Sequence, residues 1–223
     1  MASLLNFGGS HAIGWNGDGI VYSDIISQKL NLERHDFATA GASINYVIMK
    51  LLIEFENISR DDVVVIQVPT HTSRTQHVDI RDDRHKILNY VGMTQLSLQN
   101  KKEDDFIYGL KYYKSTVTND INDSLNWYQQ YHLLDNYISS LPCKHFAFRD
   151  GIIRKPKTNL GYMNELYKLE TKNIFPTSFK DFALELDIPK EQKFGRLEDG
   201  RPDPGHYTGV VHTPWAEVIM ENL

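Results

Sequence analysis

Short runs of apolar residues alternate with longer amphipathic stretches over the first 70 residues of the chain. The apolar runs at residues 2–7 and 63–66 have the length and composition of strands, and the β-branched run at 63–66 is typical of a central parallel strand buried on both faces. Residues 33–38, which are more polar, are predicted as the second strand. Between them, apolar residues recur at helical spacing over residues 18–30 and 44–55. This β-α-β-α-β order predicts a parallel sheet with right-handed crossovers and helices on both faces.

The second half of the chain has a less regular pattern. Residues 69–118 are mostly polar and show little periodicity, so we expect short helices there, in a polar insertion around 71–118 on the substrate side of the sheet. Pro214 suits the first turn of a final helix. The other predicted elements are a helix over 121–141, a strand over 145–149, and helices over 163–169, 178–184 and 213–221.

These elements predict an α/β fold with three layers, α/β/α, around a flavodoxin-like parallel sheet of about five strands. The length of 223 residues is enough to bury one sizeable core, and no internal repeat or low-complexity tract interrupts the chain. We therefore expect a single domain that spans residues 1–223.

Composition and charge narrow the classes of function. Hydrophobic residues make up 41% and charged residues 24%, which excludes a disordered, collagen-like or coiled-coil chain. The net charge of −5 argues against broad binding to nucleic acid or to anionic membranes. The sequence has a single cysteine, Cys143, which excludes an internal disulfide and a cysteine-based zinc site. We expect neither a signal peptide nor a membrane span, and therefore a cytoplasmic protein.

Small and polar residues follow three of the predicted strands, at residues 8–11, 41–45 and 67–71. Ligands of open α/β sheets bind beyond the carboxyl ends of the strands, so these segments are expected to border a site. A fourth segment, residues 203–206 with the sequence DPGH, lies just before the last predicted helix.

In this order, the segments resemble the sequence blocks of the SGNH, or GDSL-like, serine hydrolase superfamily, which includes esterases and acetylesterases. Residues 7–11 read FGGSH, with Gly9 in place of the aspartate that usually precedes the serine. Gly41 matches the glycine of the second block, and Asp203 and His206 match the Asp-x-x-His of the last block. The resemblance covers nearly the whole chain and implies the SGNH hydrolase fold.

The resemblance also implies a role for each matched residue. Ser10 would attack the substrate, His206 would take its proton, and Asp203 would hold the tautomer of His206, because a serine hydroxyl needs an adjacent base. The backbone N–H groups of Ser10 and Gly41 would stabilise the oxyanion, where losing one donor typically costs about 2.7–4 kcal/mol. His71 stands where the family commonly has an asparagine, so its imidazole N–H is the candidate third donor.

Three further residues are candidates for substrate binding, and each has a plainer interpretation. Asn45, near a helix start, faces either the site or solvent. Arg74 either binds an acidic or sugar substrate or is an ordinary surface arginine. His212 either contacts substrate or supports the site, or it is a surface residue at the start of the final helix.

Other ligand chemistries have weaker support in the sequence. Asp203, His206 and His212 are an alternative metal-binding set, but no other close His/Asp pair supports it, so we expect no metal and no cofactor. Residues 14–19, GWNGDG, lack the Lys and Ser/Thr of a phosphate-binding loop and have too few carboxylates for calcium. We interpret this segment as a flexible loop that borders the site.

The expected function is that of a serine ester hydrolase that removes small acyl groups, acetyl first among them. Its expected substrate is a carbohydrate or similar small-molecule ester. One alternative is a catalytically altered carbohydrate-binding module, which Gly9 and His71 indicate because they depart from the family pattern. Another is an acyltransferase that uses the same residues. The sequence leaves the acyl group, the alcohol and the oligomeric state open.

Overall fold

A five-stranded parallel sheet in the order β2-β1-β3-β6-β7 forms the centre of the computed structural model. The structure describes residues 2–14, 17–70, 73–80, 84–91, 120–151, 161–197 and 199–223. The strands are β1 (Ser3–Phe7), β2 (Glu33–Asp36), β3 (Val63–Val68), β6 (Lys144–Arg149) and β7 (Ile174–Phe175). This strand order confirms the predicted flavodoxin-like α/β/α fold.

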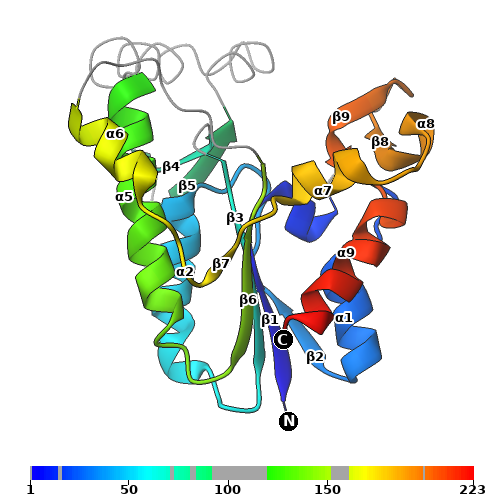
Figure 1. Cartoon of the computed structure of the whole chain (residues 1–223), viewed down its shortest axis with the longest axis horizontal. Coiled ribbons are helices and arrows are strands. Elements are labelled where there is room, and N and C mark those ends of the chain that lie inside the picture. The colour runs from blue at the N-terminus through cyan, green and yellow to red at the C-terminus, as the bar shows by residue number, and fades with distance from the viewer. Residues whose placement is uncertain are drawn as a thin grey trace.

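Helices cover both faces of the sheet (Figure 1). One layer contains α2 (Ile44–Glu54), α5 (Asp120–Ile138) and α6 (Gly161–Lys168). The other contains α1 (Tyr22–Leu30), α7 (Phe179–Glu185) and α9 (Gly209–Glu221). The core accordingly forms two clusters, one between the sheet and each layer.

The central strand β3 is buried along its whole length, as its β-branched run predicts. Its neighbours are β1 on one side, with Leu5 opposite Val64, and β6 on the other, with Phe146 opposite Val65. Asp62, directly before the strand, accepts hydrogen bonds from the backbone N–H groups of Ser3 and Ser59, both at 2.8 Å. These bonds connect the amino ends of β1 and β3, and they place the carboxyl ends of both strands at the opposite edge.

The last helix, α9, begins four residues before its predicted start. Asp18 accepts two hydrogen bonds from the backbone N–H of Gly209, at 2.9 and 3.0 Å, so a carboxylate from a distant loop caps this end. Pro214 therefore lies inside the helix and not in its first turn, which corrects the prediction. The missing proline N–H leaves the Val210 carbonyl without its usual intrahelical donor.

The polar insertion begins with an antiparallel hairpin where short helices were expected. Its strands are β4 (Ser73–Ile80) and β5 (Arg84–Val91), with His77 opposite Ile87 and Asp79 opposite His85. β-Branched residues occur in both segments, and they favour a strand in a stretch without helical periodicity. The prediction of helices is therefore wrong for this part, and residues 92–118 lie outside the described residues.

A smaller sheet pairs β8 (Phe194–Arg196) with β9 (Pro202–Tyr207), after the short helix α8 (Lys190–Lys193). The pair lies beyond α7, on the α9 side of the large sheet (Figure 1). In the part of the chain that the structure describes, no helix is both long and apolar enough to cross a bilayer.

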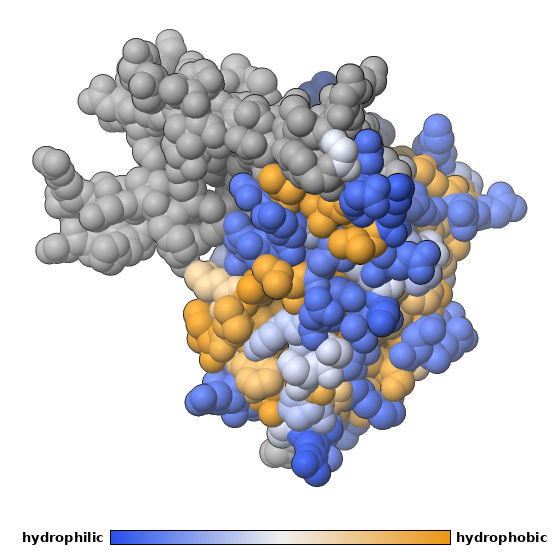
Figure 2. Space-filling view, turned by 60° about the vertical axis from the view of Figure 1, so that its left-hand side comes forward, coloured by the Kyte–Doolittle hydropathy of each residue, from blue (hydrophilic) through white to orange (hydrophobic). Residues whose placement is uncertain are grey.

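Some apolar side chains of α2 and α5 are exposed, among them Leu52 and Ile53 of α2 and Leu133 of α5. Figure 2, turned to bring the α5 side forward, shows hydrophobic side chains between hydrophilic ones on this face.

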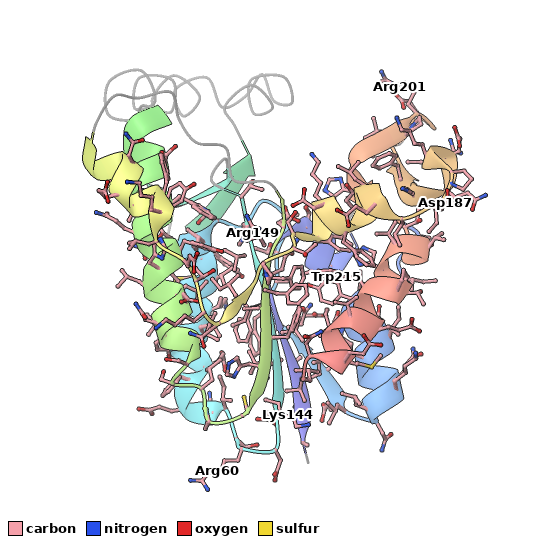
Figure 3. The ribbon with its side chains drawn as sticks, viewed as in Figure 1. Arg60, Lys144, Arg149, Asp187, Arg201 and Trp215 are labelled. Carbon is pink, nitrogen blue, oxygen red and sulfur yellow. The ribbon has the colours of Figure 1, made fainter. Side chains whose placement is uncertain are left out.

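Trp215 anchors the packing of α9 against the sheet (Figure 3). It is fully buried, and its ring centroid lies 4.8 Å from that of Phe182 and 5.1 Å from that of Phe148.

We predict that Trp215→Ala lowers the free energy of unfolding by about 3–5 kcal/mol, because it removes a large side chain from a packed core. Urea denaturation measures this loss. The control Leu52→Ala removes a side chain that is 57% exposed and should change it by less than about 0.5 kcal/mol. A loss below about 1 kcal/mol for Trp215→Ala would contradict this packing account.

Candidate active site

The carboxyl ends of the parallel strands meet at one edge of the sheet. Lys144 and Arg149 mark the two ends of β6, and Arg149 lies at the edge in question (Figure 3). A short 3₁₀ turn, η1 (Ser10–Ile13), follows β1 at this edge. Asp150 follows β6 here, and its backbone N–H donates to the Val68 carbonyl at the end of β3 at 2.9 Å.

His206 and Asp203 form a hydrogen-bonded pair on β9. His206 Nδ1 lies 2.7 Å from Asp203 Oδ2, while Asp203 Oδ1 accepts the backbone N–H of Gly205 at 3.0 Å. Both carboxylate oxygens therefore have a fixed partner. The side chains are 20% and 11% exposed, so the imidazole is accessible and the carboxylate is more sheltered.

An irregularity in the β8–β9 ladder brings these two side chains together. Phe194 pairs with Tyr207, but the next residue, Gly195, pairs with Asp203, so residues 204–206 bulge out of the ladder. In a regular strand, residues three apart point to opposite faces, and the bulge removes that restriction. The pair expected from the family resemblance therefore forms on a bulged strand.

The Ser10 turn lies beside this pair. The His11 ring centroid is 5.3 Å from that of His206, and it is also 5.3 Å from the Tyr207 ring, on which it stacks. Ser10 is partly buried at the first position of η1. The structure thus brings Ser10, Asp203 and His206 to one edge, although no hydrogen bond joins the Ser10 hydroxyl to the His206 ring.

A buried network that the sequence pattern does not predict lies beneath the turn. The Gln67 Oε1 atom accepts the backbone N–H groups of Gly9 at 2.9 Å and Ala12 at 3.1 Å. Its Nε2 donates to Asp150 Oδ1 at 2.6 Å, and the same oxygen lies 2.5 Å from His11 Nδ1. The sequence signals for this network are a polar residue within the apolar β3 and an acidic residue directly after a predicted strand.

Charge interactions within the network favour an ion pair between His11 and Asp150. Burial disfavours the charged form of His11, but the Asp150 carboxylate, with the Gly205 carbonyl and the Asp203 carboxylate, outweighs burial and raises the His11 pKa. Burial likewise disfavours the charged form of Asp150, but His11 and the Gln67 amide outweigh it, and the Asp150 pKa is lowered. The two shifts therefore favour the charged form of each group.

The loop after β2 approaches the Ser10 turn through its backbone. The N–H of Thr39 donates to the Gly8 carbonyl at 3.1 Å, and the N–H of Ala42 donates to the Thr39 carbonyl at 3.2 Å. Gly41, with φ of 72°, occupies the position of this turn that requires a left-handed backbone. The matched glycine therefore lies in a loop that is bonded to the segment before Ser10.

Three other predicted site residues have different outcomes. Arg74 lies in β4, but its side chain is not among the described ones. His71 lies outside the described residues, so its role as a third oxyanion donor stays a prediction. Asn45 is the second residue of α2, and its side chain is exposed.

The loop that was expected to be flexible contacts the site through its described residues. Asp18 caps α9, and Gly17 lies against β9, where an added Cβ would come within 2.8 Å of the Tyr207 carbonyl oxygen. Residues 15–16 are not described.

His212 is a core residue, which corrects its interpretation as a surface residue or a substrate contact. It is fully buried, and its ring centroid lies 4.9 Å from that of Phe179 and 5.7 Å from that of Tyr22. Because it packs into the core, His212 is not accessible to substrate. Among the described residues, no group of three or more His, Cys, Asp or Glu side chains is arranged to hold a metal ion.

No protein-family model matches this sequence, and no curated protein matches it. The arrangement of the residues themselves therefore carries the functional argument.

The buried His212 makes the free energy of unfolding depend on pH. Burial lowers its pKa to about 3, so the unfolded chain binds a proton below its usual pKa of about 6.5 while the folded chain does not. We predict that this residue alone removes about 1.4 kcal/mol of stability per pH unit as pH falls from about 6.5 to 3. The variant His212→Leu should lack that slope in chemical denaturation measured at about pH 7, 5.5 and 4. An unchanged slope would contradict the assignment.

Proposed function

We propose that this protein is a serine ester hydrolase of the SGNH type. Its proposed reaction removes small acyl groups, acetyl first among them, from a carbohydrate or similar ester. The observation that carries the proposal is the hydrogen-bonded pair of His206 and Asp203, which lies beside the Ser10 turn at the carboxyl edge of a parallel sheet. This edge is where open α/β sheets bind their ligands.

In the proposed reaction, Ser10 Oγ attacks the ester carbonyl carbon while His206 Nε2 takes the hydroxyl proton. Asp203 accepts the Nδ1–H of His206, which leaves Nε2 as the free base and stabilises the imidazolium that forms. His206 then gives the proton to the leaving alcohol, and the acyl group stays on Ser10. Water, activated by the same imidazole, releases the acid and restores the hydroxyl.

Two backbone donors are available for the oxyanion of that reaction. Gln67 takes the N–H groups of Gly9 and Ala12, which flank Ser10, but it leaves the N–H of Ser10 unused. Within the described part of the chain, the N–H groups of Ser10 and Gly41 donate no backbone hydrogen bond. Unused donors beside a nucleophile support an oxyanion hole, which acts through donors already in position.

The proposal requires a hydrogen bond between Ser10 and His206 that the structure does not contain. Catalytic hydrogen bonds are often long in free enzymes and tighten in the complex with substrate. Gly9, where the family has an aspartate, and the absence of this bond favour a second candidate function, a carbohydrate-binding module without catalysis. Binding of an acetylated oligosaccharide by a protein that hydrolyses no ester would support this second candidate.

We predict that Ser10→Ala reduces the hydrolysis of p-nitrophenyl acetate by at least about a thousandfold, because the nucleophile is lost. Asp203→Asn should reduce it by about 10⁴-fold, because the His206 tautomer is no longer fixed. Absorbance of released p-nitrophenol measures both. Ser139→Ala, which changes an exposed serine after the end of α5, is the matched control and should keep the full rate. Hydrolysis by Ser10→Ala at the unmodified rate would remove Ser10 from the mechanism.

A further inference from the structure

We infer that Gln67 is a positioning residue that holds the Ser10 turn in place, through a buried network that includes Asp150 and His11. The inference rests on the proposed function in one respect, namely that Ser10 is the nucleophile. Gln67 contacts the backbone on both sides of Ser10 and is 1% exposed, so it does not reach a substrate.

The two backbone amides that Gln67 binds have a particular place in the turn. Gly9 directly precedes η1, and Ala12 is its third residue, so one amide oxygen spans the segment that contains Ser10. The first N–H groups of a helical turn lack partners within it, which holds for Gly9, whereas the Ala12 N–H also donates to the Gly9 carbonyl at 3.1 Å. A buried N–H without a partner is costly, so this oxygen favours the observed turn over alternatives.

Close packing fixes the position of the Gln67 side chain. An added Cβ on Gly8 would lie 2.7 Å from both the Cβ and the Oε1 atoms of Gln67, so only glycine permits this approach. Gly9 is not constrained in this way, since an added Cβ there would lie 3.9 Å from Gln67 Oε1, an ordinary van der Waals distance. The turn therefore rests against Gln67 through Gly8.

The hydrogen-bond partners also fix which end of the Gln67 amide faces which way. Backbone N–H groups need an acceptor, so they face Oε1, and the ionised Asp150 is an acceptor only, so it faces Nε2. Glutamate in this position would keep the acceptor but place a second carboxylate oxygen against Asp150. Methionine would fill similar space with neither function.

His11 connects Asp150 back to the turn that contains Ser10. Its backbone follows Ser10, and its ring binds Asp150, so the bonds run from the turn to β3, on to the end of β6, and back. The His11 side chain is only 9% exposed. His11 therefore acts on the site through the position of its neighbours and not through substrate.

The exchange of the Gly9 and Ala12 amides with solvent tests the inference without reference to activity. In Gln67→Met, native-state hydrogen exchange resolved by NMR should accelerate at the Gly9 amide by about tenfold or more, because its acceptor is gone. The Ala12 amide should accelerate less, because it keeps its second acceptor, the Gly9 carbonyl at 3.1 Å. The amides of Leu5 and Val64 in the sheet should exchange at the unmodified rate. Exchange of the Gly9 amide at the unmodified rate would overturn the inference. If Gln67→Met does not fold, Asp150→Leu releases the other end of Gln67 and should accelerate the same amides.

Kinetics with p-nitrophenyl acetate give the second readout. Gln67→Glu should lower kcat by about tenfold or more with KM changed by less than about twofold, because the nucleophile is displaced and the binding surface is not. The surface control Gln28→Glu, on α1, should keep both constants. A higher KM with an unchanged kcat would overturn the inference.

The pH profile separates positioning from a general loss of structure. The carboxylate introduced by Gln67→Glu would face Asp150 after β6 and His11 in η1, with Asp203 and His206 of β9 beyond them. A proton shared between this carboxylate and Asp150 would replace the hydrogen bond that Gln67 Nε2 donates to Asp150. The kcat of Gln67→Glu, divided by that of the unmodified protein, should therefore rise as pH falls. Gln67→Met should show no such recovery, and a flat ratio for Gln67→Glu would count against the network. If the unmodified protein hydrolyses no ester, the proposed function fails, and the amide exchange still decides the inference.

Discussion

The side-chain amide of Gln67 is the interaction on which the geometry of the candidate site depends. It is the one polar side chain of the buried strand β3, and it joins the turn after β1 to the residue after β6. Parallel pairing brings three strand ends to a common edge, but pairing alone does not set the path of the chain beyond them. That path follows from buried donors and acceptors, each of which must find a partner.

Three histidines near this edge have different roles because their surroundings differ. His206 is 20% exposed and has one carboxylate partner, which suits proton transfer with a substrate. His11 is more deeply buried, and its carboxylate partner favours the charged form. His212 has no charged partner in contact within the described part of the chain, and burial keeps it neutral by lowering its pKa. Residue type alone does not distinguish these cases, whereas burial and neighbours do.

The sequence was sufficient to predict the sheet and its flanking helices, because periodicity determines them, while the family resemblance implied the Asp203–His206 pair. It did not predict the start of α9, where Asp18 caps Gly209 across 191 positions, or the link from Gln67 to Asp150, which spans 83 positions. The bulge in β9 also depends on a partner strand. These features arise from tertiary contacts, which a local pattern does not encode, and they include the bonds that position Ser10.

The central claim is that the edge of the sheet activates Ser10 as a nucleophile. A fluorophosphonate that reacts with activated serines tests it most directly, with the site of attachment mapped by peptide mass spectrometry. The account predicts a single adduct, on Ser10, and much slower labelling in Asp203→Asn, because an unassisted serine hydroxyl is a weak nucleophile. An adduct on another residue, or no adduct on the folded protein, would contradict it.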